Sequence, residues 1–141
     1  MSELPMHYTT CFHWLGTDSD GQIAIKRRPD MPTGSPHTDG RYCPEHMLVA
    51  AAETCLGNTV VLIAARSKLK LHAYRSSAEG ELEFEKGAGY RFKRIVIKPV
   101  LTVDAGSKEL AARVVDKSHR ACLIARSLNC PVDIEPAIET R

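Results

Sequence analysis

The sequence predicts a single α+β domain spanning residues 1–141. Its 141 residues, 43% of them hydrophobic and 26% charged, have the size and composition of one soluble globular unit. Segments with strand-like alternation lie on both sides of a long apolar segment, and a second segment has helical spacing. Strands and helices do not alternate regularly and no repeat is present, which favours an α+β fold over a repeated βαβ architecture.

The first predicted element is a β-hairpin. Residues 8–14 are rich in Thr, aromatic and Cys residues, and a turn-forming cluster at 17–21 separates them from an alternating segment at 22–26. Residues 29–40 contain three prolines and two glycines in twelve positions, so we expect a loop there. Loops of this length in compact domains often carry function.

A long central helix is predicted from about Pro44 to Leu69. A proline is well tolerated in a first turn, and the acidic Glu45 complements the helix dipole. The residues that are not apolar between positions 47 and 65 are Glu53, Thr54, Gly57, Asn58 and Thr59. The helix therefore lacks a wide polar face and should be enclosed on most sides. Because one chain of this length has little material to enclose it, we expect a homodimer.

Two strands and a second helical region are expected after the central helix. Residues 81–85 and 90–103 alternate as strands around a Gly-Ala-Gly turn at 87–89, and a change of phase between Phe92 and Ile95 indicates a bulge. A helix should begin near Ser107 and carry Cys122, either late in its course or on a short second helix ending at Asn129. Residues 132–138 are expected to form one last strand.

Charge and motifs exclude several classes of function. The net charge of +2 is spread along the chain without the basic face that nucleic-acid binding needs. Residues 1–10 have no signal-peptide pattern, and no stretch reaches about 20 consecutive apolar residues, so we expect a cytoplasmic protein without membrane contact. No nucleotide-binding or hydrolase motif is present, and no cofactor is expected.

Metal binding has little support. The sequence has no CxxC, and His119 with Cys122 is a lone pair that supplies at most two of the four ligands of a structural zinc. We therefore expect no metal, and a zinc-stabilised interaction module remains a minor alternative that metal analysis of the purified protein tests.

Two of the five cysteines, Cys55 and Cys122, lie in predicted helices among apolar residues. Structural disulfides are rare in a reducing compartment, and either cysteine alone would be interpreted as a small buried hydrophobe. Their surroundings change this interpretation. Residues 43–48 open the central helix and lead into an alanine-rich stretch that ends at Cys55, and residues 119–128 surround Cys122.

These segments resemble the family of osmotically inducible protein C and the organic hydroperoxide resistance proteins (OsmC/Ohr). In that family a Pro-Glu turn opens the central helix, a first cysteine follows ten positions after the Glu, and a second cysteine opens a short helix near the C-terminus. Pro44, Glu45 and Cys55 match the first motif, and Cys122 matches the second. The likeness is strong over roughly residues 41–128. It implies an OsmC-like fold, with a β-hairpin and antiparallel strands wrapped around the long central helices of an intertwined homodimer.

The sequence also departs from the family pattern. Cys43 stands where Asn is usual, and His46 stands where an acid or amide is usual. The family's catalytic arginine lies upstream in a variable loop. Arg27, Arg28 and Arg41 all compete for this role, and Arg28 is slightly favoured because it stands where the second strand meets the loop.

The resemblance implies a thiol-dependent peroxidase. Cys55 would attack an organic hydroperoxide as a thiolate, Cys122 would resolve the sulfenic acid, and a lipoyl-type or other external dithiol would reduce the disulfide. Cys55 lies roughly 15 Å beyond the helix start, too far for the helix dipole to depress its pKa much. Glu45 would therefore orient Arg28 or Arg41, whose guanidinium stabilises the thiolate.

An apolar lining around Cys55 predicts alkyl or fatty-acid hydroperoxides as substrates in preference to hydrogen peroxide. The residues expected to contribute to it are Met47, Leu48 and Val60. The alternative is a non-catalytic homodimer of the same fold that binds a small hydrophobic molecule or senses redox state. The two hypotheses differ in whether reduced protein consumes peroxide.

Overall fold

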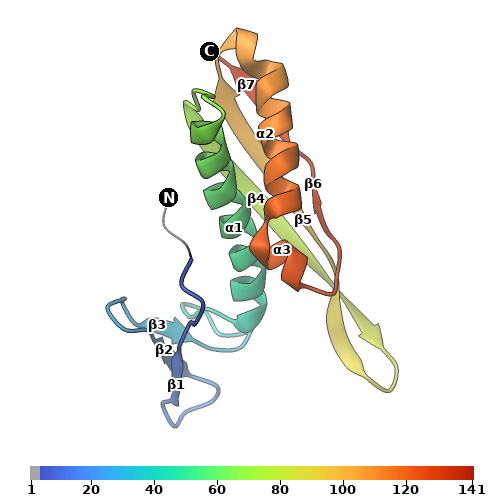
Figure 1. Cartoon of the computed structure of the whole chain (residues 1–141). Helices are drawn as coiled ribbons and strands as arrows, with labels where there is room; N and C mark the ends of the chain where they lie inside the picture. The colour runs from blue at the N-terminus through green and yellow to red at the C-terminus, as the bar shows by residue number, and fades with distance from the viewer. Residues whose placement is uncertain (1–3) are drawn as a thin grey trace. The chain divides into compact units, whose positions relative to one another are not determined.

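A computed structural model describes residues 4–141 of the chain (Figure 1). The chain divides into two compact units, residues 1–47 and residues 48–141, and each is described here by itself. The prediction about residues 1–10, that they form no signal peptide, falls partly on residues 1–3, which lie outside the described residues. The assignment of residues 1–141 to one domain stays a prediction.

The first unit contains a three-stranded antiparallel sheet with the order β1-β2-β3. Its strands are β1 (Cys11–Trp14), β2 (Gly21–Ala24) and β3 (Met31–Thr33). The predicted hairpin is confirmed by the pairing of β1 with β2. The prediction that residues 29–40 form only a loop is wrong, because β3 lies within them and pairs with β2. A strand of three residues is too short to show alternation in the sequence. Its central residue, Pro32, also has no N–H to donate to a sheet, so the sequence does not favour a strand here.

The long helix α1 (Pro44–Arg66) begins at the predicted proline. It ends three residues before the predicted end, because Lys68 adopts a left-handed conformation with φ +58°. The amide of Leu69 donates to the carbonyl of Ala64 at 2.9 Å, which closes the last turn in the manner of a helix C-cap. Lysine is rarely a helix-stopping residue, so the sequence carried no signal for this end.

By length and composition alone, α1 is a helix that could cross a membrane, although the core helix of a soluble protein meets the same criterion. The expectation of no membrane contact therefore cannot rest on the length of the apolar run. The residues buried on α1 are Ala52, Leu56, Val60, Ile63 and Ala64, which recur at helical spacing. Val61 and Leu62 on the same helix are exposed by 54% and 38%. Within one chain, α1 is thus covered on one face, and its enclosure by a second copy stays a prediction.

The second unit is built on a long hairpin, β4 (Ala73–Glu85) and β5 (Gly89–Val103). The strand β4 begins eight residues before its predicted start at position 81. The predicted bulge is confirmed: Glu81 pairs with Arg94 and Leu82 with Phe92, so Lys93 is the extra residue. The bulge separates an exposed end of the hairpin from the inner half of β5, where alternate side chains from Ile95 onward are buried.

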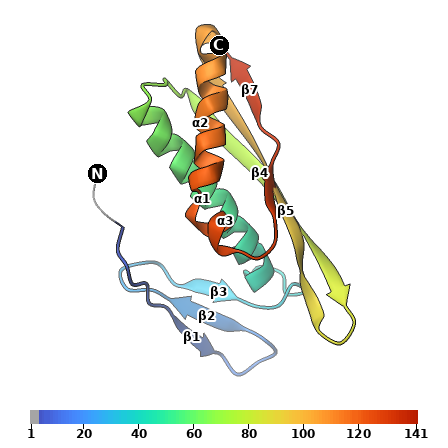
Figure 2. The same cartoon turned by 45° about the vertical axis from the view of Figure 1, so that its right-hand side comes forward.

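The polypeptide then crosses from β5 to a second helical layer. A 3₁₀ turn (Ala105–Ser107) leads into α2 (Lys108–Ala121) and α3 (Leu123–Ser127), which lie with α1 on one face of the sheet (Figure 2). The predicted last strand at 132–138 is divided into β6 (Val132–Ile134) and β7 (Ala137–Thr140). Both pair with β5 in parallel, and the interruption at Pro136 explains the division, because proline cannot donate to the ladder.

The core of the second unit lies between this sheet and the helices. It joins apolar residues of α1, β5 and α2 with the thiol-bearing residue Cys122. Burial of this surface from water is the main force that holds α1 and α2 against β5. Among its fully buried side chains are Leu56, Ile95, Ile97, Leu101 and Val115.

Candidate functional site

Cys55 lies near the middle of α1 and is half-buried against the edge of the core. The hydroxyl of Thr59, one turn later, donates to the Cys55 carbonyl at 2.8 Å. This bond keeps the Thr59 side chain on the helix backbone, on the same row of α1 as Cys55. Val60, which was expected to line the surroundings of Cys55, is fully buried and packs within the core.

Cys122 is the single residue between α2 and α3. Its backbone is extended (φ −63°, ψ 112°), so it ends one helix and begins the next. Its amide donates to the carbonyl of His119 at 3.3 Å, and its carbonyl accepts from the amide of Arg126 at 3.0 Å. The sequence predicted Cys122 either late in the second helix or on a short helix after it. Instead, the cysteine occupies the break between the two helices. The side chain is 1% exposed.

The structure brings the two cysteines together: the thiol of Cys55 lies close enough to the thiol of Cys122 to raise its pKa, and both cysteines are free. Burial raises the pKa of the Cys122 thiol, and the neighbouring Cys55 raises it further. Backbone amides of Ala125 and Ile124 in the first turn of α3 act in the opposite direction. Because burial is the largest effect, Cys122 favours the neutral thiol in the reduced protein.

A tyrosine that sequence reasoning did not single out lies close to this pair. The Tyr74 hydroxyl is buried without a hydrogen-bond partner among the described residues. Burial raises the pKa of Tyr74 to about 12, with smaller contributions from Glu53 and Cys122. Its ring lies 3.2 Å from the position that a Cβ on Gly57 would take. No local sequence pattern marks Tyr74; two positions later on β4, the Ser76 hydroxyl donates to Glu53.

Glu45, in the first turn of α1, belongs to the first unit. Its Oε1 atom is buried and has no hydrogen-bond partner within residues 4–141. Two residues earlier, the buried Cys43 accepts the amide of His46 at 3.4 Å, and its sulfur lies 3.3 Å from His46 Nδ1. Cys43 therefore takes the helix-capping place through its sulfur, as an oxygen side chain commonly does.

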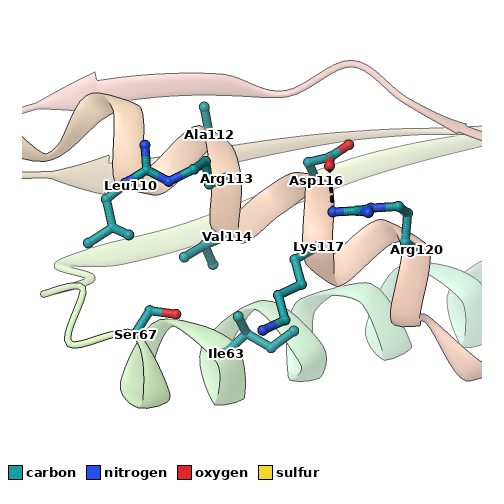
Figure 3. A pocket seen from close by; sticks show the side chains of 9 residues that line it. All are labelled: Ile63, Ser67, Leu110, Ala112, Arg113, Val114, Asp116, Lys117 and Arg120. Atoms are coloured by element: carbon teal, nitrogen blue, oxygen red, sulfur yellow. Dashed lines mark ion pairs between the residues drawn. The ribbon is translucent and has the colours of Figure 1, made fainter.

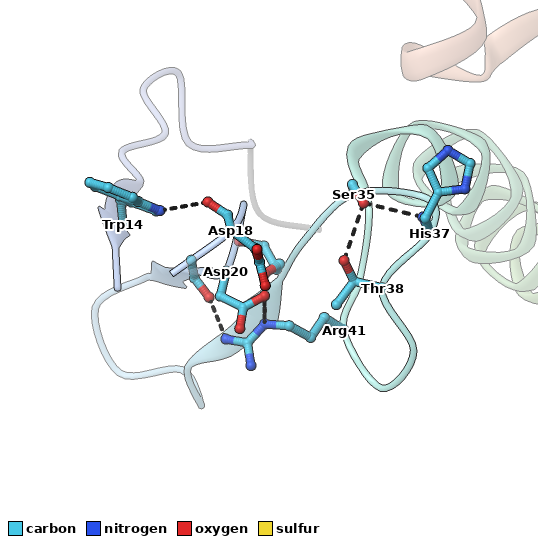
Figure 4. A network of polar contacts seen from close by, with 9 residues as sticks. Trp14, Asp18, Asp20, Ser35, His37, Thr38 and Arg41 are labelled. Atoms are coloured by element: carbon cyan, nitrogen blue, oxygen red, sulfur yellow. Dashed lines mark hydrogen bonds and ion pairs between the residues drawn. The ribbon is translucent and has the colours of Figure 1, made fainter. Parts of the chain in front are cut away.

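The two candidate arginines differ in how firmly they are held. Arg41 donates from Nε to the Thr33 carbonyl and from Nη2 to the Gly21 carbonyl, both at 2.8 Å, and faces Asp20 at 3.8 Å (Figure 4). Arg28 is exposed and makes only 3.4 Å contacts with carbonyls of its own turn. Within the described chain, neither arginine bonds to Glu45. Arg41 thus stabilises the small sheet, whereas Arg28 is the less constrained of the two.

No cluster of three or more His, Cys, Asp or Glu side chains suited to a metal ion occurs among residues 4–141. His119, which the sequence placed three positions before Cys122, contacts the Val132 carbonyl through Nε2 at 2.7 Å. Its ring therefore links α2 to the beginning of β6.

The model of the OsmC-like protein family matches residues 37–137 of the chain. The chain belongs to this family. YmaD of Bacillus subtilis, an uncharacterised protein, is 30% identical over 96 residues, a match that covers 65% of this chain and 63% of YmaD. The chain thus spans slightly less than two thirds of this curated relative.

Solved structures share the OsmC-like fold. An OsmC-like protein from Vibrio cholerae superposes with a TM-score of 0.83 at 20% identity, covering 96% of this chain and 99% of that one. An organic hydroperoxide resistance protein from Legionella pneumophila gives 0.73 at 18% identity, with 94% and 97% covered. Another from Elizabethkingia anophelis gives 0.73 at 14%, with 98% and 100% covered. At these identities the likeness establishes the α+β architecture of this OsmC-like chain.

Proposed function

We propose that this OsmC-like protein is a thiol-dependent peroxidase that reduces organic hydroperoxides. The observation that carries the proposal is the proximity of two free thiols, Cys55 and Cys122, at the edge of an apolar core. Their different burial supports a division of roles, because Cys55 is half-buried and Cys122 is almost fully buried. The more accessible thiol meets the oxidant and the enclosed one acts second. That two neighbours are named organic hydroperoxide resistance proteins is consistent with this chemistry.

In the first step the Cys55 thiolate attacks the terminal oxygen of a hydroperoxide. The S–O bond forms as the O–O bond breaks, and the alkoxide takes a proton and leaves as an alcohol. Cys55 becomes a sulfenic acid, and the peroxide is reduced by two electrons. In the second step the Cys122 sulfur attacks the Cys55 sulfur, and hydroxide leaves as water with the Cys122 proton. The product is a Cys55–Cys122 disulfide.

Turnover then requires an external dithiol, of the lipoyl type or another class, which exchanges with this disulfide and leaves as a cyclic or linear disulfide itself. The apolar residues near Cys55 favour alkyl or fatty-acid hydroperoxides over strongly hydrated hydrogen peroxide. No cofactor takes part in either half of this cycle.

For activation we propose Glu45 together with an arginine. A buried carboxylate oxygen without a partner is costly, so Glu45 is suited to hold a guanidinium. Arg28 fits this role better than Arg41, because Arg41 already donates two short bonds to backbone carbonyls. The guanidinium would stabilise the Cys55 thiolate and polarise the peroxide.

We also propose that the protein acts as a homodimer, as expected from the apolar central helix. Large apolar side chains remain exposed on α1, where Val61 is exposed by 54%, and on the first unit, where Phe12 and Trp14 are exposed by 58% and 63%. A second copy of the chain would remove such surface from water.

The experiment that tests the function measures peroxide consumption. Reduced protein is mixed with cumene hydroperoxide, a fatty-acid hydroperoxide or hydrogen peroxide in the presence of a dithiol, with Cys55→Ser and Cys130→Ser as matched variants. We expect rapid consumption of the organic peroxides by the wild type and by Cys130→Ser, and none above background by Cys55→Ser. Equal, slow consumption by all three proteins would favour the alternative, a non-catalytic hydrophobe-binding or redox-sensing homodimer.

A further inference from the structure

A cavity of about 580 Å³ lies between the C-terminal end of α1 and α2, and neither Cys55 nor Cys122 lines it. It is lined by Ile63 from α1, by Ser67 directly after the end of α1, and by residues of α2 (Figure 3). Ile63 and Val114 are nearly fully buried and Leu110 is half-buried, so these side chains form an apolar floor. A volume of this size is in the range of small-molecule sites.

The rim of the cavity is basic. Arg113, Lys117 and Arg120 all line it, and the Lys117 side chain extends from α2 toward Ile63 on α1 (Figure 3). One acidic side chain, Asp116, also lines it, and its carboxylate is held by Arg120 at 3.0 Å. Within residues 4–141 neither Arg113 nor Lys117 has an ion-pair partner. Two cations above an apolar floor therefore remain available to an anion.

The position of the cavity relates it to the thiols. Cys55, Thr59 and Ile63 follow one another at intervals of four along α1, so they form one row on the helix. Ile63 is eight residues from Cys55, or about 12 Å along the axis. On α2, Arg113 and Lys117 lie nine and five residues before Cys122, the C-cap of the helix. The cavity and the thiol pair are thus connected along α1 by the row that contains Cys55 and Ile63.

We propose that this cavity binds an amphipathic carboxylate, with the carboxylate at Arg113 and Lys117 and the apolar chain on Ile63, Leu110 and Val114. Guanidinium and ammonium groups bind carboxylates through charge-assisted hydrogen bonds, and the apolar floor removes the chain from water. An acid whose chain continues along the α1 row would reach Cys55. This last step rests on the proposed peroxidase function, whereas binding of the acid does not.

The test compares two ligands of equal chain length, decanoate and 1-decanol, by calorimetry at concentrations below micelle formation. The double variant Arg113→Gln/Lys117→Gln removes both cations, and Lys108→Gln removes an exposed cation of the same helix outside the cavity. We expect decanoate to bind the wild type and Lys108→Gln equally, and the double variant about tenfold or more weakly. Decanol should bind all three alike, and added salt should weaken only decanoate.

Equal affinity for decanoate and decanol, or an unchanged decanoate affinity in the double variant, would overturn the proposal. So would the absence of decanoate binding. A kinetic comparison separates this outcome from a failure of the proposed function. In an active enzyme the double variant should raise KM for a carboxylate-bearing hydroperoxide and leave KM for cumene hydroperoxide unchanged. If the wild type consumes no peroxide, the function is refuted, and the calorimetry still decides whether the acid binds.

Discussion

The thiol of Cys122 lies beside the thiol of Cys55, although 66 residues and four secondary-structure elements lie between the two positions in sequence. The contact arises because the chain returns from β5 through α2, which lays the break between α2 and α3 against the middle of α1. Packing of α2 against the sheet core thus places the second thiol.

Replacement of Cys122 by serine should separate the two chemical steps. Oxidation of Cys55 to a sulfenic acid does not need the Cys122 thiol. The variant should therefore still consume one equivalent of hydroperoxide, and a long-lived sulfenic acid should accumulate at Cys55. Further peroxide should convert it to sulfinic acid. Mass spectrometry after trapping with a sulfenic-acid reagent measures this, with Cys130→Ser as the control. A variant that turns over like the wild type would remove Cys122 from the mechanism.

We expect replacement of Arg28 to affect the reaction rate and replacement of Arg41 to affect stability. Arg28→Gln should lower the rate of peroxide reduction by more than about tenfold with little change in thermal stability, since Arg28 is exposed and weakly held. Arg41→Gln should lower stability, because it removes two 2.8 Å bonds that hold the first sheet. Parallel melting curves and single-turnover rates test both. A full loss of rate in Arg41→Gln alone, with unchanged melting, would reverse the assignment.

Gly80→Ala tests the packing of β4 against α1. An added Cβ would lie 2.6 Å from Val49 Cγ2 and 2.6 Å from the Phe92 ring, so a stiff side chain and a ring must both move. We expect a loss of about 1–3 kcal/mol in the free energy of unfolding, measured by urea denaturation. Gly106→Ala is the control, because no atom lies within 4 Å of its added Cβ. Equal stability of the two variants would contradict the described packing.

Tyr74 predicts a specific pH dependence of stability. In the folded protein its pKa is raised to about 12 from 10.0, so the unfolded chain loses this proton first as the pH rises. The contribution to stability is present below pH 10 and is lost between about pH 10 and 12. Urea midpoints across this window should fall more steeply for the wild type than for Tyr74→Phe. Identical slopes would show that Tyr74 titrates normally.

The proposed homodimer predicts that a charge on the exposed side of α1 separates the subunits. Val61→Glu introduces a carboxylate at a 54% exposed apolar site, which a monomer tolerates and an apolar interface does not. Sedimentation should show a dimer for the wild type and for Ala88→Glu, a change in the β4–β5 turn. Loss of the dimer in Val61→Glu should coincide with lower stability. A wild type that sediments as a stable folded monomer would refute the homodimer.

Local patterns account for the elements that the sequence predicted. The hairpin of β1 and β2, the start of α1 at Pro44 and the bulge at Lys93 each have a signal within a few residues. The strand β3 is too short, with a proline at its centre, to show a pattern, and the parallel pairing of β6 and β7 depends on a distant partner, β5. The sequence likewise identified Cys55 and Cys122 but not Tyr74, because a buried hydroxyl without a partner becomes visible only after the chain has folded.

The most direct test of the central claim is the pairing of thiols after oxidation. Reduced protein receives one equivalent of an organic hydroperoxide, remaining thiols are alkylated, and peptides are mapped by mass spectrometry without reduction. The proposed mechanism predicts the loss of two thiols per chain and a single intramolecular bridge between Cys55 and Cys122. A bridge from Cys43 to Cys55, or five alkylated cysteines with no bridge, would contradict it.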